Sequence, residues 1–148
     1  MYTLDSSNDF KFINNLELPT KNSIFSVNMS YEYDQDVKYF VSLMKSTGCT
    51  QRWCGAMVAD VHQILMRGGT FIYPSTINMP RGKIRLLYEA LPMAYIFTLL
   101  NGTAVDVNNS PLLNKIQHVR LLNKDVHGET PVILTTHYSR KELGNIFA

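Results

Sequence analysis

Residues 52–74 read RWCGAMVADVHQILMRGGTFIYP, and this stretch predicts two consecutive elements of the fold. Apolar side chains recur in it at the three- and four-residue spacing of an amphipathic helix, which predicts a helix over residues 55–67. Those side chains are Met57, Val58, Val61, Ile64 and Leu65. Gly68 and Gly69 tolerate positive φ and end the helix. Residues 70–73 then form a buried strand that Pro74 closes, so the stretch predicts a helix leading directly into a strand.

The same alternation of helices and strands extends in both directions. Further strands are predicted over residues 11–18, 23–27, 83–88, 103–107 and 131–135. Further helices are predicted over residues 34–48, 89–100 and from Ser139 onward, where Ser139 and Glu142 fit a capping box. We therefore expect an α/β fold, a mixed β-sheet flanked by helices, as one domain over residues 1–148. The chain opens inside a sheet region, as a half cut from a larger protein would.

Composition and charge exclude several classes of protein. The chain has 148 residues, of which 45% are hydrophobic and 18% charged, an ordinary globular composition. The net charge of +2 comes without a basic cluster, which argues against nucleic-acid binding. No apolar run approaches the roughly 18 residues of a membrane span, and no signal-peptide pattern opens the chain, so we expect a cytoplasmic protein. Cys49 and Cys54 do not form a disulfide or zinc pattern, so we expect reduced thiols.

Side chains that suit a negatively charged sugar gather between residues 52 and 95. They are Arg52, Tyr73, Lys83, Arg85, Tyr88 and Glu89. A phosphate needs several donors, and each hydrogen bond from a charged donor contributes roughly 1.5–3 kcal/mol. Taken singly, these residues also have ordinary interpretations, because a lysine in a turn is usually solvated and a strand tyrosine usually packs in a core. Arg85 is as compatible with a structural role as with a functional one.

The order of residues resembles class I fructose-1,6-bisphosphatases. Residues 52–62 resemble their R-Y-x-G-S-M-V-A-D-x-H segment, and residues 68–74 resemble G-G-x-F-x-Y-P. Residues 82–95 resemble G-K-L-R-L-L-Y-E-x-N-P-M-A-Y, and residues 25–31 resemble Y-S-x-N-x-x-Y. The segments follow in the family's order at near-family spacing and cover nearly the whole chain. The chain therefore resembles the carboxyl-terminal half of such a protein.

The resemblance implies a phosphate site. Asn28, Tyr31, Tyr73 and Lys83 match residues that hold the phosphate distal to the reaction. Arg52 matches an arginine that reaches into the neighbouring subunit's phosphate site, which implies a homo-oligomer. The ligand implied is fructose 1,6-bisphosphate or fructose 6-phosphate.

The resemblance also implies a reaction. Met57 matches a residue whose backbone contacts the sugar, and Glu89 matches a carboxylate that ligates a catalytic divalent metal. The implied activity is magnesium-dependent hydrolysis of the 1-phosphate ester, a step of gluconeogenesis and carbohydrate metabolism, in which the metal polarises the phosphoryl group and activates water.

The metal site is incomplete in this sequence. The family's D-P-x-D-x-S motif is not found, and Asp5 and Asp9 fit no part of it. Magnesium needs several hard oxygen ligands, so Glu89 alone cannot hold a catalytic cluster. We therefore expect no phosphatase activity from this chain alone and a partner that supplies the missing amino-terminal half. The surface that meets this half should be apolar.

Departures from the family pattern leave two functions open. Trp53 stands where the family has tyrosine, Leu91 where it has asparagine, and residues 127–130 lack the usual arginine. The chain is either the sugar-phosphate-binding half of a fructose-1,6-bisphosphatase or a non-catalytic subunit that serves binding or assembly in a larger complex. Sedoheptulose bisphosphate is a further substrate candidate.

Overall fold

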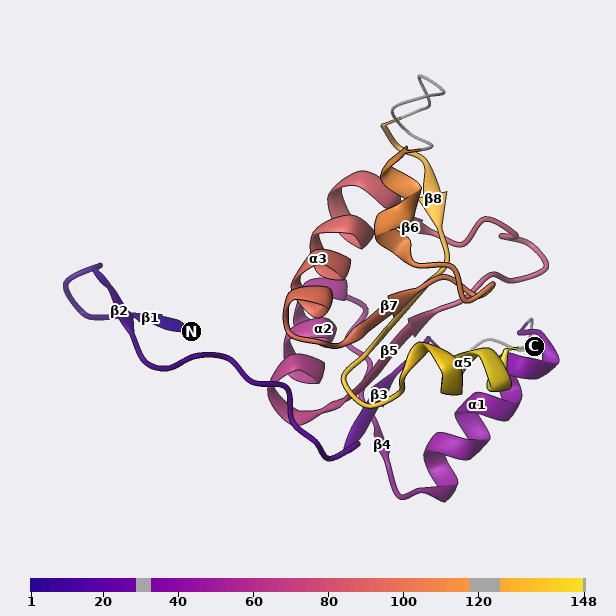
Figure 1. The fold of residues 1–148 in the computed structure, drawn as a ribbon, viewed down its shortest axis with the longest axis horizontal. Helices are drawn as coiled ribbons and strands as arrows, with labels where there is room; N and C mark the ends of the chain where they lie inside the picture. The colour runs from indigo at the N-terminus through magenta and orange to yellow at the C-terminus, as the bar shows by residue number, and fades with distance from the viewer. Residues whose placement is uncertain (29–32, 118–125, 148) are drawn as a thin grey trace.

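The structure is a computed structural model that describes residues 1–28, 33–117 and 126–147. Within these residues the body is a mixed five-stranded sheet with helices on both faces (Figure 1). In spatial order its strands are β4 (Thr50–Gln51), β3 (Ile24–Ser26), β5 (Gly69–Tyr73), β9 (Val132–Thr135) and β7 (Thr103–Val105). β3 is parallel to β4 and β5, whereas β9 is antiparallel to β5 and β7. The predicted α/β fold with a mixed sheet is confirmed.

The two predicted helices that connect the parallel strands are present. α1 (Gln35–Ser46) begins at Asp34, whose carboxylate accepts a hydrogen bond from the backbone N–H of Val37 at 3.0 Å. α2 (Met57–Arg67) starts two residues later than predicted and ends at Gly68, where φ is +77°. A Cβ on Gly68 would lie 2.0 Å from the backbone oxygen of Lys21, so only glycine fits at this turn.

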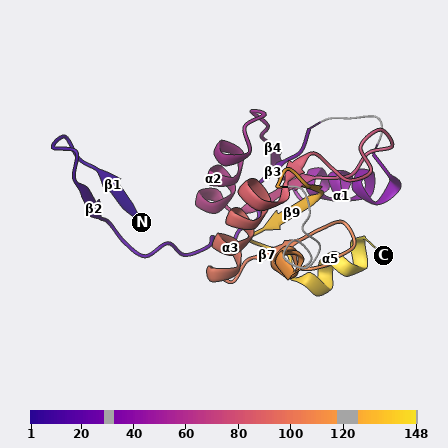
Figure 2. The same cartoon turned by 90° about the horizontal axis from the view of Figure 1, so that it is seen from above.

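Helices cover the two faces of the sheet in pairs (Figure 2). α2 and α3 (Leu91–Leu99) pack on one face, and α1 and α5 (Arg140–Ile146) pack on the other. Successive strand residues point to opposite faces, so Ile24 joins the α2/α3 core and Phe25 joins the α1/α5 core. α5 opens with the predicted capping box of Ser139. No described helix combines the length and apolarity that a membrane crossing requires.

The prediction of a strand over residues 83–88 is wrong in its second half. β6 (Ile84–Arg85) pairs with β8 (Glu129–Thr130) in a separate two-stranded ribbon, and a π-helical turn, Leu86–Ala90, then leads into α3. The Glu89 carboxylate accepts the backbone N–H of Arg85 at 2.6 Å. This contact closes a helical turn, so strand pairing ends at Arg85. A short 3₁₀ turn, Leu112–Asn114, follows β7.

The prediction of a strand over residues 11–18 is also wrong in its extent. β1 (Tyr2–Leu4) and β2 (Phe10–Phe12) form an antiparallel hairpin that stands apart from the body (Figure 1). Pairing is local because Asp5 shapes the connection, accepting the backbone N–H groups of Ser7 and Asp9 at 2.8 and 3.0 Å. The residues after β2 run to the body without joining a strand, although Leu18 packs against the α2/α3 core.

Candidate functional site

The parallel part of the sheet defines where a ligand site is expected. The chain leaves the carboxyl end of β3 toward α1 on one face and leaves the neighbouring β4 toward α2 on the other. In open α/β sheets, ligands bind outside the carboxyl ends of strands at such a switch point. The residues that follow β3, β4 and β5 are therefore the first candidates.

Asn28 follows β3, and Tyr73 is the last residue of β5. β3 and β5 pair in parallel up to Ser26 opposite Phe71, so Asn28 and Tyr73, each two residues farther along its own segment, come at the same edge of the sheet. The side-chain oxygen of Asn28 accepts a hydrogen bond from the hydroxyl of buried Tyr33 at 2.8 Å. This bond uses the carbonyl end of the amide, so the NH₂ end is the one that can donate to a phosphate oxygen.

Arg52 follows the third parallel strand. Its backbone N–H donates to the carbonyl of Phe25 at 2.8 Å, which extends the β3–β4 pairing to the point where the chain leaves the sheet. The Arg52 side chain is exposed. The next residue, Trp53, packs its indole against the ring of Tyr73, with centroids 5.9 Å apart and planes inclined at 49°. Trp53 therefore limits the positions that the Tyr73 ring can take.

Met57 opens α2 directly after these residues. Buried Asp60, in the first turn, accepts the backbone N–H of Cys54 through both carboxylate oxygens, at 3.1 and 3.3 Å. This contact fixes the loop between Arg52 and the helix, and the carboxylate lies where the helix dipole favours negative charge. Asp60 thus has a local structural role, whereas His62 on the same helix is exposed.

Lys83 reaches the same edge through the antiparallel strands. Ile84 lies opposite Thr130, so continuing the register places Lys83 opposite Pro131. Pro131 precedes Val132, the partner of Tyr73 across β5 and β9. The Lys83 side chain is exposed. The ammonium group is therefore carried by a segment that runs next to the end of β5.

Glu89 lies on the π-helical turn that follows β6. Its carboxylate is half-buried and bound to the Arg85 N–H, as described above. The Arg85 guanidinium donates to Glu129 at 2.5 Å and to the carbonyl of His127 at 3.1 Å. The hydroxyl of Tyr88 lies 3.0 Å from Nδ1 of the same histidine. Hydrogen bonds and an ion pair from Arg85 and Tyr88 thus connect the start of the π-helical turn to residues in and just before β8.

The structure brings some predicted residues together and leaves others apart. Asn28, Arg52 and Tyr73 end the three parallel strands, and Lys83 and Met57 adjoin them. Glu89 lies on a separate turn, and Tyr31 falls outside the described residues. Their binding roles stay predictions. Across residues 1–28, 33–117 and 126–147, no three histidine, cysteine, aspartate or glutamate side chains come together as a metal site would need.

Three contacts escaped the sequence analysis. Nothing in the apolar pattern indicates that Tyr33 holds Asn28, because the two lie in an irregular connection. The Trp53–Tyr73 contact was signalled only by the departure of Trp53 from the family's tyrosine. The pairing of Arg85 with Glu129 joins residues 44 positions apart, and the one signal was the missing family arginine in that segment.

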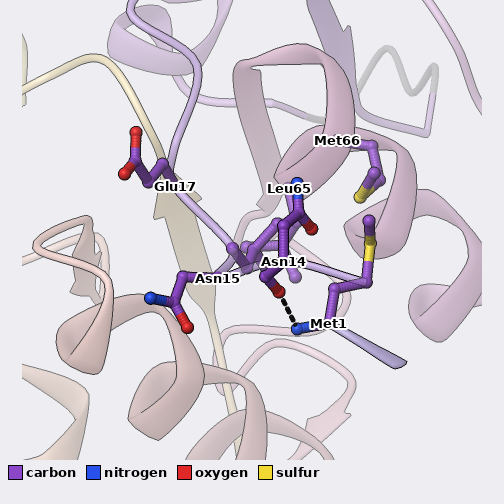
Figure 3. A pocket seen from close by; sticks show the side chains of 7 residues that line it. Met1, Asn14, Asn15, Glu17, Leu65 and Met66 are labelled. Carbon is purple, nitrogen blue, oxygen red and sulfur yellow. Dashed lines mark hydrogen bonds between the residues drawn. The ribbon is translucent and has the colours of Figure 1, made fainter. Parts of the chain in front are cut away.

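A cavity at the base of the hairpin lies apart from these residues. It has a volume of about 480 Å³ and none of the predicted site residues lines it. Its walls are formed by Met1, Asn14, Asn15, Leu16, Glu17, Leu65 and Met66 (Figure 3).

Comparison with known proteins identifies the family. A mixed sheet of five strands with helices on both faces defines an α/β domain. The sequence model of the family described as fructose-1,6-bisphosphatase, carboxyl-terminal domain, matches residues 18–139. The chain belongs to this family. The resemblance inferred from four sequence segments is confirmed.

Curated relatives are class 1 fructose-1,6-bisphosphatases. One from Sulfurihydrogenibium sp. is 36% identical over 132 residues, which are 87% of this chain and 39% of the relative. One from Thermosynechococcus vestitus is 37% identical over 125 residues, 82% of this chain and 34% of the relative. One from Campylobacter hominis is 32% identical over 148 residues, 99% of this chain and 51% of the relative. The chain spans about a third to a half of the length of these relatives.

Proposed function

We propose that this chain is the sugar-phosphate-binding half of a fructose-1,6-bisphosphate 1-phosphatase. The observation that carries the proposal is that Asn28, Arg52 and Tyr73 end neighbouring parallel strands, with Lys83 on the adjoining segment. An amide, a guanidinium, a phenol and an ammonium group offer the several donors that a phosphate dianion needs, two of them charged. Backbone groups at Met57 would contact the sugar.

The proposed ligand can be tested by thermal unfolding. Fructose 6-phosphate at millimolar concentration should raise the melting temperature, because a ligand that binds only the folded state stabilises it. Lys83→Ala should abolish the rise. Lys141→Ala, which removes an exposed lysine from α5, should leave it unchanged. No shift in the unaltered chain would contradict the proposal, and a comparison with sedoheptulose 7-phosphate separates the two sugar candidates.

Magnesium does not fit this chain alone. The relatives' activity implies a metal site, and Glu89 is the one side chain here proposed as a ligand. Its carboxylate already accepts the Arg85 N–H, and no cluster of ligating side chains surrounds it within the described residues. A magnesium site needs several oxygen ligands in octahedral geometry. We therefore assign no hydrolytic step to this chain, and we expect no turnover of fructose 1,6-bisphosphate unless further ligands come from an amino-terminal half.

Association of this chain with a second copy of itself is part of the same proposal. Arg52 is exposed at the end of β4, where it could complete a phosphate site in a second copy, and we propose a homo-oligomer on this basis. Arg52→Ala should then lower fructose 6-phosphate affinity only in the oligomeric fraction separated by size-exclusion chromatography.

We also propose a cytoplasmic location, which accompanies this metabolic role. The thiols Cys49 and Cys54 are both free, as in a reducing compartment.

A second candidate is a non-catalytic subunit for binding or assembly. The Arg85–Glu129 ion pair favours it, because the segment 127–130 lacks the arginine usual in the family and its Glu129 engages an arginine that could otherwise face a phosphate. One experiment distinguishes the two candidate functions. Addition of the amino-terminal part of a relative, with magnesium, should restore turnover if this chain is an enzyme half. A stable complex without turnover would favour the non-catalytic subunit.

A further inference from the structure

Asp106, which directly follows β7, is buried and forms an ion pair with Lys115. One carboxylate oxygen of Asp106 lies 2.7 Å from Nζ of Lys115. The other carboxylate oxygen accepts the backbone N–H groups of Asn108 and Ser110, each at 2.9 Å. These two bonds close the turn after β7 by themselves, as aspartate commonly does in turns. The ion pair is therefore an addition to a turn whose hydrogen bonds are already made.

Lys115 makes a second hydrogen bond, which leads away from this turn. It is the C-cap residue of the 3₁₀ turn after β7, and Figure 1 shows this segment, in orange, beside β8. Its ammonium group donates to the hydroxyl of buried Thr130 at 2.9 Å, and that hydroxyl donates to the backbone carbonyl of Pro131 at 3.1 Å. Successive donors that point the same way strengthen one another, and a charged first donor makes the strongest bond.

Pro131 lies where the segments that carry Tyr73 and Lys83 meet. Its neighbour Val132 pairs with Tyr73 across β5 and β9. On the other side, the backbone of Gly82 passes so close that a Cβ there would lie 2.6 Å from the nitrogen of Pro131. Because proline has no N–H to donate, its carbonyl is the backbone group through which hydrogen bonds hold this place. We call this place the strand junction; it comprises residues 82–83 and 130–132.

We infer that Lys115 is a positioning residue for the proposed phosphate site. Through the hydroxyl of Thr130 it fixes the strand junction, and the junction sets the separation between the Lys83 ammonium group and the Tyr73 phenol. Lys115 itself does not touch the ligand. The inference rests on the proposed function, because it assigns Lys115 to the same site.

A purely structural role for Lys115 has different consequences. The side chain of Lys115 is 26% exposed, so its ion pair with Asp106 is partly screened by water and contributes only modestly to stability. Loss of such a pair would weaken the fold as a whole. A positioning role predicts instead a local loosening of the strand junction and a weaker contact between Lys83 and the phosphate.

The first test compares Thr130→Val with Thr130→Ser. Valine keeps the shape of the buried side chain and leaves the Lys115–Asp106 pair in place, but it removes the hydroxyl. Fructose 6-phosphate affinity, measured by calorimetric titration, should fall about fivefold in Thr130→Val, the effect of one hydrogen bond, and should recover in Thr130→Ser. The affinity of the valine variant should also depend less steeply on salt concentration, because the Lys83 ammonium group engages the phosphate less closely.

Lys115→Met should produce the same two changes. Methionine keeps an unbranched side chain in this position and removes the ammonium group. Lys11→Met is the matched control, because it removes an ammonium group that is likewise paired with an aspartate, Asp5, at 2.6 Å, but in the hairpin. This control should change neither the affinity nor its salt dependence.

Amide hydrogen exchange measures the strand junction without any ligand. The N–H of Leu86 donates to the carbonyl of Gly128 at 2.7 Å and reports the β6–β8 ribbon. The N–H of Thr50 donates to the carbonyl of Ser23 at 3.0 Å and reports the β4 edge of the sheet. In Thr130→Val, exchange at Leu86 should become about fivefold faster while exchange at Thr50 stays unchanged.

Two results would overturn the inference. One is a Thr130→Val variant with full affinity and unaltered salt dependence, and the other is equal acceleration of exchange at Leu86 and Thr50, which indicates global destabilisation alone. If the unaltered chain does not bind fructose 6-phosphate, the proposed function fails and the exchange measurement decides on Lys115. Local acceleration at Leu86 then still supports Lys115 as the residue that holds the strand junction, and its absence overturns that role as well.

Discussion

The hydroxyl of Tyr33 donates a hydrogen bond to the side-chain oxygen of Asn28 over 2.8 Å and so orients the amide at the end of β3. Tyr33→Phe removes this donor and keeps the buried ring. We expect the free energy of unfolding to fall by about 1 kcal/mol, the usual contribution of one such bond. We also expect several-fold weaker binding of fructose 6-phosphate, because the amide is then free to turn its oxygen outward. Chemical denaturation and calorimetric titration measure the two effects.

Tyr39→Phe is the matched control for this prediction. Tyr39 lies on α1 and is exposed, so the loss of its hydroxyl should change neither quantity. If Tyr33→Phe lowered stability but left affinity intact, Tyr33 would serve the core and would not position Asn28.

The contact between Trp53 and Tyr73 provides a direct signal of ligand binding. Trp53 is the one tryptophan of the chain, and its ring lies 5.9 Å from that of Tyr73. A phosphate bound by the Tyr73 hydroxyl would change the surroundings of the indole, so fructose 6-phosphate should change tryptophan fluorescence in a saturable way. Trp53→Tyr restores the hydroxyl of the family pattern, which can both donate and accept, and should tighten binding several-fold.

Fructose without phosphate is the control for the fluorescence titration and should leave the emission unchanged. A Trp53→Tyr variant with unchanged or weaker affinity would indicate that the indole is itself a ligand contact.

Gly82 fixes the position of Lys83. Its φ is +74°, and a Cβ there would lie 2.6 Å from the backbone nitrogen of Pro131 and 2.7 Å from the carbonyl carbon of Thr130. Gly82→Ala must therefore push the loop away from the start of β9. We expect a loss of stability greater than the roughly 1 kcal/mol of positive-φ strain alone, together with loss of fructose 6-phosphate binding.

Gly48→Ala separates these two contributions. Gly48 has a φ of +79°, and a Cβ there would have nothing within 4 Å, so the substitution brings strain without a clash. Equal losses of stability in both variants would mean that the close approach of Gly82 to Pro131 has no energetic consequence.

The parts of the fold that could be predicted from the sequence are those with a regular spacing of apolar residues or with a residue that caps a helix. The apolar spacing of α1 and α2 and the capping groups at Asp34 and Ser139 locate three helices, because periodicity and capping are local properties. The π-helical turn at Leu86–Ala90 was missed, since it depends on one side-chain contact, Glu89 to the Arg85 N–H, that no pattern of apolar residues reveals.

The candidate site was predictable as a set of residues and not as an arrangement. Family motifs singled out Asn28, Tyr73 and Lys83, but their proximity depends on strand register, which the motifs do not specify. The hairpin was missed for a different reason. Alternation predicted one strand at residues 11–18, whereas the Asp5 turn pairs β2 with β1.

Acid should loosen this hairpin. The ion pair with Lys11, at 2.6 Å, and the backbone N–H groups of Asp9 and Ser7 lower the pKa of the Asp5 carboxyl below its ordinary value of 3.8. A lowered folded-state pKa means that the carboxylate stabilises the hairpin at all pH values above 3.8 and that this contribution is lost as the pH falls through the folded pKa. Nuclear Overhauser contacts between the rings of Tyr2 and Phe12, whose centroids are 5.4 Å apart, report the paired state.

These ring contacts should therefore persist from neutral pH to about pH 4 and weaken below it. In Asp5→Ala, which removes the acceptor for both turn N–H groups, they should already be weak at neutral pH. Lys11→Ala keeps the Asp5 acceptor of the turn and removes only the exposed ion pair, whose contribution is small and screened by salt. This variant should therefore raise the pH midpoint of the acid transition. The hairpin should still form at neutral pH. Ring contacts that are independent of pH in the unaltered chain would show that cross-strand packing of aromatic side chains, and not the Asp5 turn, holds the two strands together.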